Sequence, residues 1–143
     1  MRTTVAAVIA GGFLLTAAYA TVGAQATRSV NEGVYTADQA KRGEPIYKEQ
    51  CATCHGDNLE GSGPMPPLAG KDFVSVWGGK TVGELFEKTH ATMPATAPGT
   101  LTEPQAADIV AYMLSVGMFP AGMTELGTAK DALDQIKIEA PTQ

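Results

Sequence analysis

Apolar residues recur at intervals of three and four along two stretches of the chain, which is the period of a helix with one buried face. The remaining positions of these stretches are mostly polar or small, as expected for a helix that turns its other face to solvent. The later stretch carries Ala106, Ile109, Val110, Met113 and Leu114, and the earlier one carries Val82, Leu85 and Phe86.

Both stretches, and a third nearer the start of the chain, begin with the same device. A Thr is followed three residues later by Glu or Gln, a pairing that satisfies two backbone N–H groups at a helix start. Pro104 fits this reading because proline is tolerated in the first helical turn. No segment shows a convincing strand pattern, so an all-α fold is predicted. The three predicted helices span residues 37–50, 82–89 and 103–116, after Thr36, Thr81 and Thr102.

The segment 57–79 is rich in Gly and Pro and is predicted to form no regular element. A loop of this length is unusual in a compact domain unless it wraps around something.

The first 26 residues have the pattern of a secretory signal peptide. Arg2 supplies the positive start, residues 5–18 are apolar, and residues 24–26 read small-x-small, as a cleavage site does. An uncleaved membrane anchor is the alternative, although the apolar run is shorter than the ~20 residues that span a bilayer. We therefore expect an exported, bacterial, periplasmic protein that begins at Thr27 and has no stable membrane insertion after cleavage.

The chain is acidic, with 143 residues and a formal net charge of −5, and loss of Arg2 would make it more acidic still. Nucleic acid is therefore an unsuitable partner. After the signal peptide, we expect an N-terminal extension over residues 27–34, one domain over 35–119 and a C-terminal extension over 120–143. A domain of this size buries a modest core and usually needs an additional staple. The apolar residues of the tail, spaced among charges over 123–138, predict that it packs back on the domain.

The run Cys51-Ala52-Thr53-Cys54-His55 has the spacing that attaches a c-type haem. Each thiol would form a thioether with the haem, and His55 would bind the iron. Three other readings are a thioredoxin-like redox pair, a structural disulfide and half of a zinc site. A redox pair should lie beside a βαβ pattern, which we do not find, and zinc needs four ligands.

A sixth iron ligand would come from a histidine or methionine elsewhere in the chain. Met113 reads as core filler, whereas Met93 precedes a proline in an irregular, extended segment that can present its thioether to the iron. Met65 also precedes a proline but lies only ten residues after His55. We favour Met93, with His90 and Met65 as alternatives. The full set of candidates is His90, Met65, Met93, Met113, Met118 and Met123.

The order of these motifs resembles the class I cytochromes c over about residues 35–116. The resemblance implies the class I fold, three main helices plus loops wrapped around one covalently bound haem c. It also implies that Gly43 lets the first helix cross the last, and that the carbonyl of Pro66 accepts the Nδ1 proton of His55. The matching positions are Gly43 and Tyr47, then Cys51, Cys54 and His55, then Pro66, Leu68 and Gly70, then Met93-Pro94, and last Ala111-Tyr112.

A narrower likeness, over residues 92–101, 108–112 and 119–122, is to the cytochromes fused to or accompanying quinoprotein alcohol dehydrogenases. Trp77 would either hydrogen-bond a haem propionate, as a tryptophan does in some relatives, or simply pack. Lys80 would face a propionate or lie at the solvated surface.

These features predict a periplasmic mono-haem electron carrier rather than an enzyme. It would pass electrons through transient contacts, from a quinoprotein dehydrogenase to a terminal oxidase or another cytochrome. One alternative is a haem sensor or enzyme with an open sixth position, in which Met93 is dispensable. Another is a permanent electron-entry subunit, in which the tail after Phe119 forms an interface instead of packing on its own domain.

Overall fold

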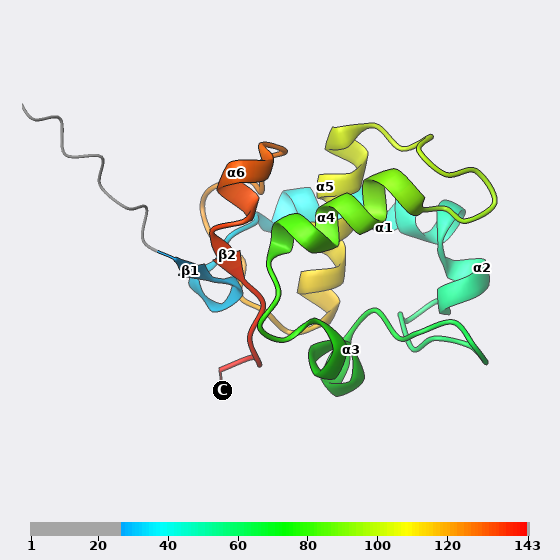
Figure 1. The fold of residues 1–143 in the computed structure, drawn as a ribbon, viewed down its shortest axis with the longest axis horizontal. Coiled ribbons are helices and arrows are strands. Elements are labelled where there is room, and N and C mark those ends of the chain that lie inside the picture. The colour runs from blue at the N-terminus through cyan, green and yellow to red at the C-terminus, as the bar shows by residue number, and fades with distance from the viewer. Residues whose placement is uncertain (1–26, 143) are drawn as a thin grey trace, which may run out of the picture.

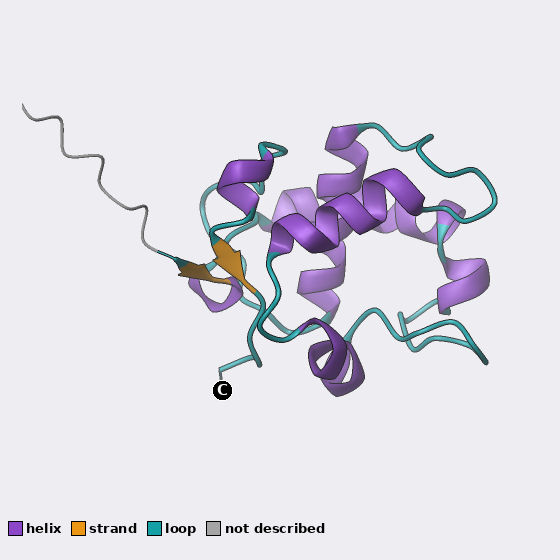
Figure 2. Cartoon of the chain, in the orientation of Figure 1, coloured by secondary structure: helices purple, strands orange, loops and turns teal. Residues whose placement is uncertain are grey.

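The computed structural model describes residues 27–142, and most of the regular structure in this range is helical (Figures 1 and 2). The predicted signal peptide lies outside the described residues. The helices are α1 (Ala37–Gln50), α2 (Ala52–His55), α3 (Gly70–Trp77), α4 (Val82–Thr92), α5 (Glu103–Val116) and α6 (Lys130–Leu133). A 3-10 turn (Val30–Glu32) and two short strands, β1 (Arg28–Ser29) and β2 (Ile136–Lys137), complete the elements.

Helices α1 and α5 cross at Gly43, as the family resemblance implies. A Cβ atom at this position would overlap the carbonyl oxygen of Asp108, so only a glycine allows this approach. Tyr47 and Tyr112 pack beside the crossing with ring centroids 5.4 Å apart. Helix α4 packs against α5 of this crossed pair.

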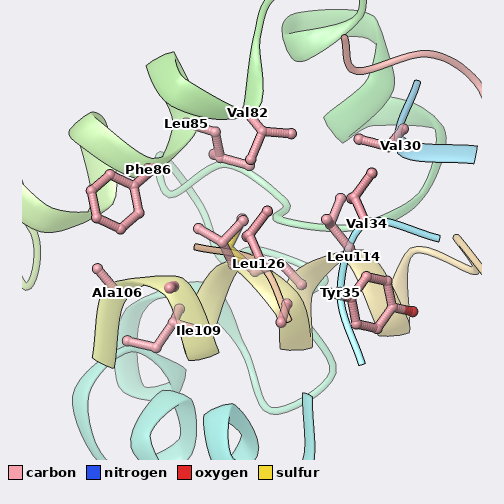
Figure 3. Packing of buried hydrophobic residues seen from close by; sticks show 14 of the residues in the cluster. Val30, Val34, Tyr35, Val82, Leu85, Phe86, Ala106, Ile109, Leu114 and Leu126 are labelled. Atoms are coloured by element: carbon pink, nitrogen blue, oxygen red, sulfur yellow. The ribbon is translucent and has the colours of Figure 1, made fainter. Parts of the chain in front are cut away.

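The buried core joins α5 and α4 to α1 and to the segments on either side of α1. Side chains Val82, Leu85 and Phe86 of α4 point toward α5 in Figure 3. Met113 is 3% exposed, which confirms its reading as core filler.

The predicted helix starts are confirmed, with one difference in detail. Thr81 and Thr102 form complete capping boxes with Glu84 and Gln105. Thr36 accepts from the backbone N–H of Gln39, but the Gln39 side chain turns to the tail instead of returning to the cap. Helix α4 also runs three residues beyond its predicted end, to Thr92.

The prediction that residues 57–79 hold no regular element was wrong, because α3 lies within them. Gly70 begins the helix at φ +76° and Gly78 caps it, while the prolines of this segment all precede it. The glycines and prolines therefore mark the ends of a short helix whose inner face carries the buried Phe73.

The absence of strands was also wrong in detail, since β1 and β2 pair in parallel. Strands of two residues are too short to show alternation along the sequence. Their pairing ties the N-terminal extension to the tail. The tail is also tied to the segment between α3 and α4, because the Gly79 N–H donates to Ile138 O at 2.8 Å.

The tail packs on the domain, as its apolar spacing predicted. Four of its apolar side chains, Leu126, Leu133, Ile136 and Ile138, are at most 5% exposed. The β1–β2 pair and α2 lie at opposite ends of the molecule (Figure 1), and α4 runs from the strand end toward the α2 end. None of the helices between residues 27 and 142 has the length and apolar character needed to cross a bilayer.

Candidate functional site

Cys51, Cys54 and His55 share one helical turn. Cys51 ends α1, and its carbonyl oxygen accepts from the N–H groups of Cys54 and His55 at 3.1 and 2.9 Å. Residues three and four apart on a helix lie on the same face. The turn therefore groups two thiols and an imidazole, and both thiols are free.

The ring of His55 is fixed by a backbone carbonyl. Its Nδ1 atom lies 2.9 Å from the carbonyl oxygen of Pro66, as the resemblance implied, and the residue is only 8% exposed. A carbonyl oxygen accepts hydrogen bonds and cannot donate them, so Nδ1 carries the proton. The lone pair is then on Nε2, where a metal ion can bind.

The thiol environment disfavours a thioredoxin-like reading. Burial, together with the neighbouring Cys54, raises the pKa of the Cys51 thiol to about 11. Catalytic C-x-x-C pairs have the opposite property, a lowered pKa that supplies a reactive thiolate. Two free thiols next to an oriented imidazole, with the Cys51 thiol held in its protonated form, fit covalent attachment of a haem better than redox exchange.

The loop after α2 is hydrogen-bonded back onto this turn. The N–H of Gly61 donates to the carbonyl oxygen of His55 at 2.8 Å, and the Tyr47 hydroxyl donates to that of Gly56 at 2.7 Å. Leu68 N–H donates to Leu59 O at 2.9 Å. The sequence did not single out Leu59, because nothing about a leucine indicates the positive φ that it adopts here.

Met93 lies where α4 ends. It caps the helix with its N–H donating to Thr89 O, and its φ of −118° and ψ of 153° are extended, as expected before proline. The side chain is half-buried. Because α4 runs toward the α2 end of the molecule, Met93 lies at the same end as the thiols (Figure 1).

The other candidate ligands have different surroundings. His90 stacks on Phe86 with ring centroids 5.8 Å apart. Met65 is 38% exposed in a tight turn with Ser62, and it immediately precedes the proline that binds His55. Met118, just after α5, and Met123, on the tail, are 81% and 98% exposed.

Trp77 is engaged by packing on its own helix and by a cation. Its ring stacks on Phe73, with centroids 6.3 Å apart, and the Lys80 Nζ lies 4.8 Å from the Trp77 ring centroid. Contacts of Trp77 and Lys80 with haem propionates stay predictions.

Comparison with known proteins identifies the family. A family model described as "Cytochrome C oxidase, cbb3-type, subunit III" matches residues 38–113, more than half of the chain. Cytochrome c of Sesamum indicum is 30% identical over 95 residues, which cover 51% of this chain and 86% of that protein.

Two larger proteins share part of their length with this chain. Thiosulfate dehydrogenase of Stutzerimonas stutzeri (strain A1501) is 36% identical over 81 residues, which cover 52% of this chain and only 26% of that protein. The crystal structure of the sulfane dehydrogenase SoxCD from Paracoccus pantotrophus superposes with a TM-score of 0.51 at 22% identity, covering 78% of this chain and 59% of that one. This last likeness shows a shared fold.

The matched segment 38–113 contains the C-x-x-C-H turn and reaches into α5. The chain therefore belongs to the family described as cytochrome c oxidase, cbb3-type, subunit III, and it is a class I mono-haem cytochrome c, an electron carrier with covalently bound haem c.

Proposed function

We propose that this protein is a periplasmic single-electron carrier whose haem is attached through Cys51 and Cys54 and whose iron is bound by His55 and Met93. The observation that carries the proposal is the 2.9 Å contact between His55 Nδ1 and Pro66 O. It fixes the tautomer that leaves Nε2 available to iron, on the same turn as the two thiols. A hydrogen bond of this kind also raises the basicity of a histidine ligand.

Bound haem c supplies a reversible one-electron change at its iron. The chain holds that group in place and tunes it. A thioether such as that of Met93 favours the reduced iron and raises the potential, so a carrier with a positive potential is expected.

The placement of Met65 supports Met93 over its main methionine rival. Met65 is joined directly to Pro66, which lies against the Nδ1 side of the His55 ring. A residue held there belongs to the histidine side of a haem, whereas Met93 comes from a different helix. His90 is engaged with Phe86.

If His55 and Met93 both bound the iron, no position would stay open for oxygen, peroxide or a substrate. This supports electron transfer rather than catalysis or gas sensing. In either of those alternative functions, Met93 would be dispensable, and carbon monoxide would bind the reduced protein readily.

The packing of the tail supports a transient carrier rather than a permanent subunit. The apolar side chains that would form an interface in a permanent complex, Leu126 and Leu133 among them, are buried against the protein itself. Transient redox complexes use small patches and need no such surface.

We further propose that the electron donor is a periplasmic dehydrogenase and the acceptor an oxidase or another cytochrome. The likeness to part of a thiosulfate dehydrogenase supports a dehydrogenase as redox partner. A quinoprotein alcohol dehydrogenase as donor stays a prediction. The periplasmic location rests on the signal-peptide pattern of residues 1–26.

Absorption spectroscopy tests the ligand assignment. We expect the ferric protein to show the far-red charge-transfer band of thioether-ligated haem, and we expect Met93→Ala to abolish it. Met65→Ala is the matched control and should retain the band. Loss of the band in Met65→Ala but not in Met93→Ala would overturn the assignment, and a high-spin wild-type spectrum with ready carbon monoxide binding would overturn the carrier function.

A further inference from the structure

Leu59 combines complete burial with a backbone conformation that branched side chains rarely adopt. Its φ is +61°, in the left-handed region, and its side chain is 0% exposed. It lies in the loop between α2 and α3, four residues after His55. A non-glycine residue held in this region calls for an explanation from its surroundings.

The conformation of Leu59 reverses the chain beside the histidine. The Leu59 N–H donates to the carbonyl oxygen of Gly56 at 3.3 Å, and the Leu59 carbonyl accepts from the N–H of Leu68 at 2.9 Å. The second bond draws the segment 66–68 back toward α2. Pro66, two residues before Leu68, then reaches His55 Nδ1.

The same loop uses glycine at its other left-handed positions. Gly56 and Gly61 have φ values of +83° and +78°, and each is close to His55. Glycine adopts such values without steric cost. A glycine at position 59 would therefore adopt this φ with less steric strain. The presence of leucine instead points to a requirement for its buried side chain.

We propose that Leu59 is a positioning residue for the iron ligand. Its side chain anchors the reversed loop in the core, the loop carries the Pro66 carbonyl to His55, and that carbonyl orients the imidazole. This inference rests on the proposed function, because it takes His55 as the ligand. Leu59 would act indirectly, because its two backbone hydrogen bonds are with Gly56 and Leu68 and not with His55 or the cysteines.

The direction of the expected effect follows from the hydrogen bond. A bond from Nδ1–H to a carbonyl makes the imidazole a stronger donor and favours oxidised iron. If the loop relaxes, this bond weakens and the reduction potential rises. Backbone amides that close the loop, those of Gly61 and Leu68, should then exchange with solvent faster.

The test compares Leu59→Ala and Leu59→Gly with Leu133→Ala in the haem-loaded protein. Leu133 is a matched control because it is also a buried leucine, 1% exposed, and lies in α6 at the other end of the molecule. Potential and amide exchange are measured well below the unfolding temperature of each variant. We expect Leu59→Ala to raise the potential and to accelerate exchange at Gly61 and Leu68 at least ten-fold, Leu59→Gly to do so less, and Leu133→Ala to change neither.

The inference is overturned if Leu59→Ala and Leu133→Ala behave alike in both measurements. If Leu59→Ala does not fold, Leu59→Met and Leu59→Val decide the question. Methionine keeps the anchor without branching and should resemble wild type. Valine is branched at Cβ and should raise the potential, and equal potentials for the two would again overturn the inference.

The wild-type spectrum separates this failure from failure of the proposed function. A wild-type protein without the thioether band or with a high-spin spectrum contradicts the ligand set itself. A wild-type protein with the band, in which Leu59 variants match the control, contradicts only the role of Leu59.

Discussion

Gly43 and Asp108 lie in direct backbone contact where α1 crosses α5, with the glycine Cα facing the Asp108 carbonyl. The same two helices are joined at their surface by Arg42, whose Nε and Nη2 atoms each lie 3.1 Å from the Asp108 carboxylate. Arg42 also binds Glu125 of the tail at 2.8 Å. One helix crossing thus fixes α1, which ends at the thiols, and anchors the tail beside it.

Gly43→Ala should destabilise the protein although alanine is the better helix former. The added methyl group would overlap the Asp108 carbonyl, and such overpacking costs more than the ~1 kcal/mol that helix propensity returns, leaving a net loss of about 2 kcal/mol. Denaturant unfolding measures the change. Gly127→Ala is the control, because a Cβ there meets no atom within 4 Å. Equal stability of Gly43→Ala and wild type would contradict this prediction, because it would mean that α1 and α5 can move apart at the crossing without loss of stability.

Local signals predicted the helices that carry their own start device, but they did not predict features set by distant contacts. Thr81 and Thr102 cap their helices through neighbours three residues away, so sequence alone suffices. The β1–β2 pair joins residues more than a hundred positions apart, and no local pattern records that pairing.

The candidate site likewise contains features that local sequence predicts and features that depend on distant contacts. The C-x-x-C-H spacing is local and identifies the attachment turn directly. The role of Gln39 was misread, because a Thr-x-x-Gln pattern predicts a return to the cap, whereas a buried backbone segment of the tail competes for the amide. The left-handed Leu59 depends on the whole loop and had no sequence signal.

Gln39→Ala should detach the tail from α1. The buried Gln39 amide donates to Leu126 O at 2.9 Å and accepts from Leu126 N–H at 2.7 Å. Removing it leaves a buried donor and a buried acceptor without partners, which should cost about 3 kcal/mol. The readouts are unfolding free energy and limited proteolysis of the tail. Gln50→Ala, an exposed glutamine at the end of the same helix, should change neither. A protease-resistant tail in Gln39→Ala would contradict this role.

Tyr47→Phe should loosen the site without disturbing the aromatic pair. The Tyr47 hydroxyl donates to Gly56 O at 2.7 Å, next to His55, while its ring packs on Tyr112. Phenylalanine keeps the ring and removes the hydrogen bond, so we expect a loss of about 1 kcal/mol in unfolding free energy. Exchange of amides in residues 56–61 should accelerate. In the control Tyr112→Phe, that exchange should stay at the wild-type rate, and equal exchange rates in both variants would refute the anchoring role of Tyr47.

Asp134 should make the stability of the protein depend on pH in the acidic range. Lys130 donates to its carboxylate, and this ion pair, aided by the Thr81 hydroxyl, holds the pKa of Asp134 below its ordinary value of 3.8. A carboxylate with a lowered folded-state pKa adds stability that is fully present above its unfolded-state pKa. That stability is lost as pH falls through the lower, folded-state value.

We therefore expect Asp134→Asn to be less stable than wild type at pH 5–7. The two proteins should converge as pH falls through the lowered, folded-state pKa of Asp134. Urea unfolding across this pH range measures the difference in stability. The control is Asp131→Asn, which removes an exposed carboxylate from the same helix. It shows how much stability acid removes through other groups, including the haem ligands. A constant difference between Asp134→Asn and wild type down to the lowest pH would mean that Asp134 acts through its shape and not its charge.

The Asp134 side chain lies against Gly83 in the first turn of α4, so its negative charge also favours that helix start. Convergence in acid would thus show that Asp134 stabilises the protein through its charge, by way of Lys130 and the first turn of α4.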